Sequence, residues 1–106
     1  MTEFHIDYTD QAIINLADIG DYMGLDNPEQ ADSFIDEIVE FIDATLSRFP
    51  YAASVKFTAY PSVRLLPYRR YNIYYQVIDN DPDEEKIIEI LFIHNSAKLS
   101  PYEKDQ

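Results

Sequence analysis

The apolar residues of this chain change their spacing near Pro50. Between residues 9 and 49 they recur every three or four positions, whereas after residue 62 they occur in short alternating or continuous runs. The first spacing is typical of amphipathic helices and the second of β-strands. The chain must therefore place helices and strands in separate layers around one core, which is an α+β arrangement.

Two helices are predicted before Pro50. The first covers residues 9–24, because Thr9 can cap it and an apolar stripe follows at helical spacing. The second covers residues 27–49, where Asn27 can cap and acidic residues follow the face opposite the apolar stripe. The connection between them is too short for anything but an antiparallel helical hairpin.

Four segments either alternate polar and apolar residues or are rich in β-branched and aromatic residues, as strands are. They are residues 3–8, 63–66, 71–79 and 87–94. The order is thus strand, helix, helix and three strands. We expect the helical hairpin to pack on one face of a twisted antiparallel sheet of about four strands. The other face would be open to solvent or to a partner. We expect residues 1–106 to form one domain, with a polar tail over residues 95–106 that can fray.

Composition excludes several classes of protein. The absence of cysteine excludes disulfides, thiolate zinc sites and a cysteine nucleophile. Two glycines are too few for either of the common glycine-rich nucleotide loops. No apolar run approaches the roughly 20 residues that cross a bilayer. We therefore expect a soluble, cytoplasmic protein without a membrane partner.

Charge is distributed unevenly around a net value of −12. Residues 1–47 contain twelve acidic residues and no Lys or Arg, whereas residues 48–78 contain five basic residues and no acidic one. The overall acidity disfavours direct binding to free DNA. One middle segment is nevertheless basic.

The basic segment suggests a binding face. If the apolar neighbours of Arg64 face the core, Arg64 faces outward, close to Arg69 and Arg70 in the following connection. Alternation in the next strand places Tyr74 on the outward side. Arginines and tyrosines on one face can bind phosphate and stack on bases. The alternative is that the tyrosines are ordinary strand residues and the arginines an ordinary solvated surface.

Catalytic patterns are scarce. His5 and His94 are the only histidines, and both are interpreted as structural or merely exposed. No paired histidine spacing supports a metal site, and we predict neither a metal nor a cofactor. A nuclease without histidine pairs would need Tyr, Lys and Arg side chains in one pocket.

Several strings follow the opening strand in a fixed order: AIINLADIGDY at 12–22, NPEQADSF at 27–34, Phe49-Pro50, VRLLPYRRYNIYYQV at 63–77 and ILFIH at 90–94. These strings and the order of elements resemble the RelE/ParE superfamily of bacterial toxins from type II toxin-antitoxin modules, often labelled plasmid stabilisation proteins. Each string is weak alone, but together they cover nearly the whole chain in the order and spacing of the family.

The resemblance implies a toxin that a cognate antitoxin wraps and neutralises. We expect the antitoxin to lie across the hairpin and the adjoining sheet surface, where Ile19, Tyr22, Met23 and Tyr75 would contact it. Relatives have one of two activities: they cleave mRNA on the ribosome, or they poison DNA gyrase without catalysis.

The residues that the resemblance assigns to a nuclease are Arg64, Lys56 and Tyr102. Arg64 and Lys56 fall where such enzymes place basic residues, and Tyr102 matches their C-terminal tyrosine approximately. Relatives commonly follow the last strand with glycine and basic residues, whereas residues 94–97 here read HNSA. Together with the net charge, this favours the non-enzymatic, ParE-like branch. A ribosome-dependent nuclease and a non-toxic antitoxin-binding module are the alternatives.

Overall fold

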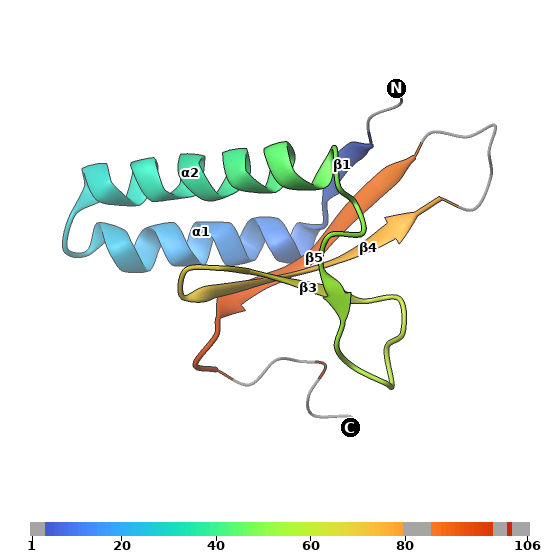
Figure 1. Cartoon of the computed structure of the whole chain (residues 1–106). Helices are drawn as coiled ribbons and strands as arrows, with labels where there is room; N and C mark the ends of the chain where they lie inside the picture. Colours follow the sequence, from blue (N-terminus) through green and yellow to red (C-terminus); the bar gives the residue numbers. More distant parts are fainter. Residues whose placement is uncertain (1–3, 80–85, 99–101, 103–106) are drawn as a thin grey trace.

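The computed structural model describes residues 4–79, 86–98 and 102. Its elements, in chain order, are β1 (His5–Tyr8), α1 (Asp10–Gly24), α2 (Pro28–Leu46), β2 (Ser54–Val55), β3 (Arg64–Tyr68), β4 (Tyr71–Ile78) and β5 (Ile87–Asn95). The two helices lie side by side over one face of the sheet (Figure 1). The predicted α+β class and the helical hairpin are thus confirmed.

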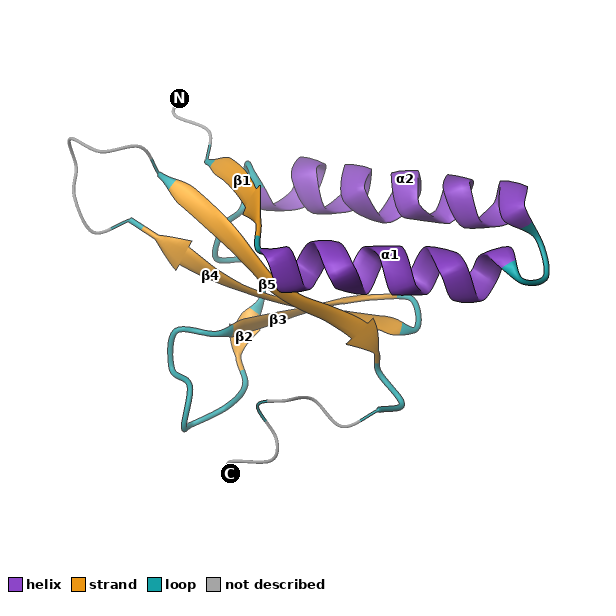
Figure 2. Ribbon diagram, turned by 180° about the vertical axis from the view of Figure 1, so that it is seen from behind, coloured by secondary structure: helices purple, strands orange, loops and turns teal. Residues whose placement is uncertain are grey.

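The sheet has five strands in the order β1-β5-β4-β3-β2 (Figure 2). Strand β1 pairs with β5 in parallel, and the other neighbours are antiparallel. The expectation of about four antiparallel strands was therefore wrong in two details. Strand β2 has only two residues, both exposed, and so has no alternation that the sequence could reveal. The order of elements does not specify the direction in which β1 joins the sheet.

Both helix caps are confirmed. The Thr9 hydroxyl accepts the Ala12 N–H at 3.1 Å and donates to the Ile90 carbonyl at 2.9 Å, which ties the start of α1 to β5. The Asn27 side-chain oxygen accepts the Gln30 N–H at 3.1 Å. Each cap satisfies a backbone donor that the first turn of a helix leaves unpaired.

Helix α2 ends at Leu46 instead of the predicted Phe49. Leu46 is fully buried, whereas Phe49 is 64% exposed. The ring of Pro50 disfavours the helical conformation of the residue before it. The chain therefore leaves the helix before Phe49 and turns toward β2.

The main core lies between the hairpin and the sheet. Ile38 and Ile42 of α2 are fully buried against Ile73 of β4 and Ile88 of β5. Fully burying a side chain of this size contributes about 1.5–3 kcal/mol. The hairpin is therefore held to the sheet by one apolar cluster to which both helices contribute.

The opposite face of the sheet is covered, contrary to the expectation that it is open. A second cluster lies there: Phe57, Val63 and Tyr74 are buried, and Tyr60, Leu65, Leu91, Phe92 and Tyr102 pack against them. The loop between β2 and β3 passes over this face (Figures 1 and 2). This loop carries Phe57 and Tyr60, so it supplies the apolar side chains that cover the strands.

Two tyrosine hydroxyls of the main core differ in whether they form hydrogen bonds. The Tyr75 hydroxyl donates to the Pro50 carbonyl at 2.9 Å and accepts the Ala53 N–H at 3.3 Å, both in buried surroundings. The Tyr8 hydroxyl is also buried, but it has no hydrogen-bond partner among the described residues. Removing one hydroxyl or the other should therefore change the free energy of unfolding differently.

We expect Tyr75→Phe to lower the free energy of unfolding by about 1–3 kcal/mol, because it leaves a buried carbonyl and a buried N–H unpaired. The matched control is Tyr8→Phe, which removes an unpaired buried hydroxyl and should leave stability unchanged or raise it. Urea unfolding of the three proteins measures both effects. Equal stability of the two variants would contradict this account of the Tyr75 hydroxyl.

Alkaline pH gives a second test of the buried phenols. Burial, with a smaller contribution from Asp43, raises the pKa of Tyr8 from 10.0 to about 12. The folded chain then holds this proton more tightly than the unfolded chain, so the stabilisation is complete below pH 10 and is lost as the pH rises toward 12. Tyr8→Phe should therefore lose less stability than the unmutated chain between about pH 9 and about pH 11.5. Urea unfolding at the two pH values measures this, and equal losses would contradict it.

Candidate functional site

Arg64 does not face away from the helices. It is paired in register with Tyr75, whose side chain belongs to the main core, so Arg64 lies on the helix-covered side of the sheet. Its Nη1 donates to the Ala53 carbonyl at 2.7 Å, and its guanidinium lies 5.0 Å from the centre of the Tyr51 ring. The prediction of its direction was wrong because Val63 and Leu65 belong to the second cluster.

Arg69 and Arg70 form the turn between β3 and β4, away from Arg64. Tyr68, the last residue of β3 before this turn, is four strand positions from Arg64, a distance of roughly 13 Å. The Arg69 Nη2 lies 3.1 Å from the Glu37 carboxylate of α2, which also accepts the Tyr68 hydroxyl at 2.9 Å. The three arginines therefore do not form one basic face, and an acidic residue of the hairpin neutralises one of them.

Arg69 also has an unusual backbone. Its φ of 55° lies in the left-handed region that favours glycine. A two-residue hairpin turn needs such a conformation to match the twist of its strands. The strand pairing on both sides of the turn thus fixes the direction of Arg69 toward α2.

Tyr74 and Tyr102 lie in the second cluster. Tyr74 is 1% exposed, so it cannot stack on a base in this fold. The ring of Tyr102 lies 5.3 Å from that of Tyr74 and 5.1 Å from that of Tyr60. Burial, followed by Tyr74 and Tyr60, raises the pKa of Tyr102, which makes its phenolate scarcer at neutral pH.

The predicted nuclease residues do not converge. Arg64 and Tyr102 are on opposite faces of the sheet. Lys56 is exposed and directly follows β2. An acid–base pair needs side chains within hydrogen-bond reach of one reacting group. Arg64 and Tyr102 do not meet this requirement, because the sheet lies between their side chains.

A groove of about 640 Å³ separates α1 from the end of β5. Strand β1 pairs with β5 only as far as Ile90, so within the described part of the chain no strand lies beside the rest of β5 on that side. Instead, the side chain of Asn15 in α1 accepts the Ile93 N–H at 3.0 Å. We call this surface the α1–β5 groove; it is lined by Asn15, Asp18, Ile19, Tyr22, Tyr71, Phe92, Ile93, His94, Asn95 and Lys98.

Within the described residues, no three His, Cys, Asp or Glu side chains are placed to hold a metal ion. In the same part of the chain, none of the helices combines the length and apolar composition needed to span a bilayer.

Residues 6–99 match the family model described as "ParE toxin of type II toxin-antitoxin system, parDE". The chain belongs to the ParE toxin family. It is thus a toxin of the type II toxin-antitoxin class, and the resemblance to the RelE/ParE superfamily is confirmed.

Solved structures agree with this assignment. A chain from the chromosomal ParDE TA system of P. aeruginosa has a TM-score of 0.68 and 25% identity, over 88% of this chain and 96% of that one. A chain from the toxin-antitoxin complex RelBE2 of Mycobacterium tuberculosis has a TM-score of 0.67 and 19% identity, over 92% and 97%. The second likeness concerns the fold alone. A search of curated proteins gives no match.

The four residues predicted to contact an antitoxin lie in different surroundings in this ParE-family chain. Tyr22 and Ile19 both line the α1–β5 groove, where Tyr22 is 75% exposed and Ile19 is buried. Met23 is partly buried against the main core. Tyr75 is fully buried, so no partner reaches it while the chain is folded in this way.

His94 is a groove residue that the sequence interpretation missed. Its ring stands edge-on to the rings of Tyr74 and Phe92, at 5.4 and 5.1 Å. Both ring nitrogens are buried and have no hydrogen-bond partner among the described residues. A lone histidine at the end of an apolar strand carries no sequence signal for this position, since the groove depends on where β1 stops pairing.

The groove gives a prediction for Asn15. In Asn15→Ala the Ile93 amide loses its acceptor, so its hydrogen exchange should become faster. The His94 amide is the internal control, because alternation directs it toward β4. Amide exchange followed by NMR measures both. Unchanged exchange of Ile93 would contradict the assigned contact.

Proposed function

We propose that this ParE-family toxin arrests growth by binding a protein target such as DNA gyrase, without cleaving RNA. The observation that carries the proposal is the composition of the surface around Arg64. Tyr51 and Val55 flank Arg64 and are 54% and 42% exposed, and Phe49 is exposed two residues before Tyr51. We call these four residues the Arg64 patch.

The Arg64 patch resembles a protein interface more than a phosphate-cleaving site. Aromatic residues and arginine are enriched at the centres of protein interfaces and dominate their binding energy. The Arg64 guanidinium is already held by the Ala53 carbonyl and the Tyr51 ring, which gives it a fixed direction before a target binds. Preorganisation of this kind lowers the entropic cost of association.

The acid–base groups that a nuclease requires are poorly placed. His5 pairs with Asp7 at 2.8 Å on β1, and His94 is enclosed by aromatic rings. Tyr102 is separated from Arg64 by the sheet. The net charge of −12 also opposes approach to an RNA surface. These features support target binding over catalysis.

A cognate antitoxin would neutralise the toxin through the α1–β5 groove. Both solved relatives belong to toxin-antitoxin systems. The groove combines an exposed aromatic residue, Tyr22, with a length of β5 that lacks a neighbouring strand. Extended segments bind by pairing with such strand edges, and helices bind by placing an apolar face in a groove.

The test pairs one exposed tyrosine from each surface. Tyr51→Ala should inhibit gyrase supercoiling roughly 30-fold less well, as expected for a central interface residue worth about 2 kcal/mol. It should still bind the antitoxin encoded beside it. Tyr22→Ala should do the reverse, retaining inhibition and losing antitoxin binding.

The same proteins distinguish the alternative functions. Ribosome-associated mRNA cuts that disappear in Arg64→Ala would overturn the proposal in favour of a nuclease. Unimpaired growth at high expression without the antitoxin would overturn it in favour of a non-toxic antitoxin-binding module. Growth arrest with inhibited supercoiling and intact mRNA is the expected result.

A further inference from the structure

Positive charge surrounds the Arg64 patch, although the chain as a whole is strongly acidic. Arg48 directly precedes the exposed Phe49, Lys56 directly follows the exposed Val55, and both cations are exposed themselves. No acidic residue occurs between residues 44 and 78. The patch is therefore bordered along the chain by a cation on each side, in addition to Arg64 itself.

Backbone contacts hold residues 48–56 next to Arg64. The Tyr75 hydroxyl, as described above, bonds to the backbone at Pro50 and at Ala53. Tyr75 is also the register partner of Arg64 in the pairing of β3 with β4. The end of the segment is β2, which pairs directly with β3. The fold therefore gathers the three cations near β2 before a partner binds.

Arg48, Lys56 and Arg64 have no ion pair among the described residues. In the same part of the chain, Glu37 and Asp79 are each paired with another cation. Arg64 uses its Nη1 for a backbone carbonyl. A guanidinium has five N–H donors, in a fork that fits a carboxylate. The remaining donors of Arg64 are therefore available to an acidic group of another molecule.

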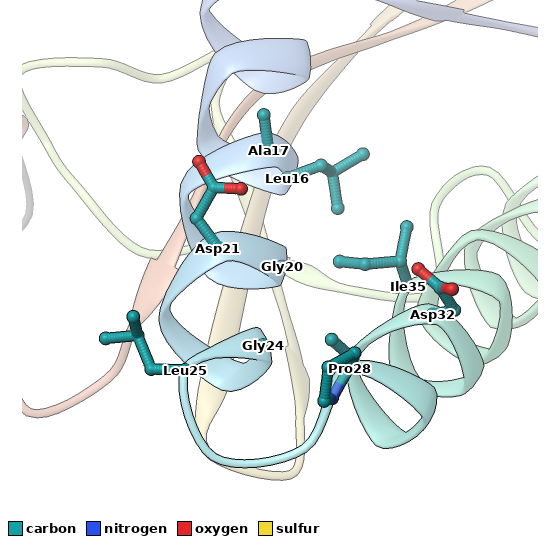
Figure 3. A pocket seen from close by; sticks show the side chains of 10 residues that line it. Leu16, Ala17, Gly20, Asp21, Gly24, Leu25, Pro28, Asp32 and Ile35 are labelled. Carbon is teal, nitrogen blue, oxygen red and sulfur yellow. The ribbon is translucent and has the colours of Figure 1, made fainter.

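The helical hairpin presents the opposite charge. Figure 3 shows Asp21 of α1 and Asp32 of α2 beside the groove of about 690 Å³ between the two helices, with Leu16 and Ile35 between them. Residues 1–47 contain twelve acidic residues and no Lys or Arg. An acidic ligand is repelled by such a surface and attracted by the cations of the Arg64 patch. Charge therefore favours one surface of the chain for it.

We propose that the Arg64 patch, together with Arg48 and Lys56, binds an acidic segment of the target protein. One carboxylate of that segment would pair with the free donors of Arg64, and neighbouring carboxylates would face the other two cations. An apolar side chain of the segment would lie against Phe49 and Tyr51. Charge-assisted bonds of this kind are roughly twice as strong as neutral ones. This assignment rests on the proposed function, since it gives the chemistry of the target at the same site.

RNA and a second copy of this chain fit the three cations less well. Three phosphate contacts to a single strand give a salt slope of only about −2. A long polyanion would also meet the acidic hairpin, and a second copy carries the same net charge of −12. At physiological salt, charges more than about 8 Å away are largely screened. A short acidic segment therefore responds mainly to the cations that it touches.

A blocked peptide of about 12 residues, with Asp and Glu around one Phe, provides the probe. A matched peptide has Asn and Gln at the acidic positions. NMR titration of the full chain should show amide shifts over residues 48–56 and at Arg64, at least about fivefold larger with the acidic peptide. These shifts should decrease as salt is raised. No shifts, or equal shifts around Arg70 and Lys98, would overturn the proposal.

Matched charge reversals test the same cations against the target. Arg48→Glu and Lys56→Glu each change an exposed side chain, whereas a change at Arg64 would also remove its contact with the Ala53 carbonyl. Each of the two variants should inhibit gyrase supercoiling at least about fivefold less well. The control is Arg70→Glu, which changes the net charge equally in the exposed β3–β4 turn and should weaken inhibition less than about twofold.

The outcomes separate this proposal from the function on which it rests. Inhibition that Lys56→Glu and Arg70→Glu reduce equally would overturn the acidic segment and leave target binding in place. Binding of the acidic peptide by a chain that does not inhibit gyrase would do the reverse.

Two further measurements address the other occupants. A single-stranded RNA of equal charge that displaces the peptide at a lower concentration would assign the surface to RNA and overturn the proposal. The chain should sediment as a monomer at the concentrations used. A dimer that Lys56→Glu dissociates would assign the surface to a second copy and also overturn the proposal.

Discussion

Two neighbouring tyrosines of β4, Tyr74 and Tyr75, are both almost completely buried although they point to opposite faces of the sheet. This is possible only because each face carries its own apolar cluster. The hairpin supplies one cover and the loop after β2 supplies the other. Most of the rest of the molecule follows from this arrangement, since a strand covered on both sides has no room for charged side chains.

The basic residues are consequently placed at the margins of the sheet. Arg64 sits at the start of β3, next to the two-residue strand β2, and Arg69 sits in the turn at the other end of β3. Arg64 lies beside the exposed ring of Tyr51, whereas Arg69 forms an ion pair with Glu37 of α2. The two arginines therefore have different chemical surroundings even though only four residues lie between them in the chain.

The sequence was sufficient to predict the helices, their caps and the three longer strands of the second half, because each has a local signature of period or capping residue. Two features depended on tertiary contacts. The parallel pairing of β1 with β5 has no local signal, and β2 is too short to alternate. The direction of Arg64 was predicted incorrectly for a related reason: alternation distinguishes two faces but does not say which one the helices cover, and here both are apolar.

The same limit applies to the residues of the proposed site. Tyr22 was expected to contact a partner only because of the resemblance to a toxin family, since no local pattern in the sequence distinguishes it. His94 could not be predicted, because its place in the α1–β5 groove depends on where β1 stops pairing. Tyr51 was missed because it lies in an irregular segment after α2, where no periodicity marks an exposed side chain as functional.

The positions of the α1–β5 groove and the Arg64 patch constrain how an antitoxin could act. Helix α1 packs over β5, whereas α2 packs over the β3–β4 turn through Phe34, Phe41 and Glu37. The α1–β5 groove and the Arg64 patch therefore lie on opposite flanks of the hairpin. In the sheet, Asn95 pairs with Tyr71 and Arg64 with Tyr75, which puts the two sites roughly 16 Å apart.

A segment confined to the α1–β5 groove would leave the Arg64 patch exposed. Steric neutralisation of the Arg64 patch then requires at least about five further extended residues. A segment that ends within the groove could neutralise the toxin only by changing the shape of the Arg64 patch from a distance, and not by covering it.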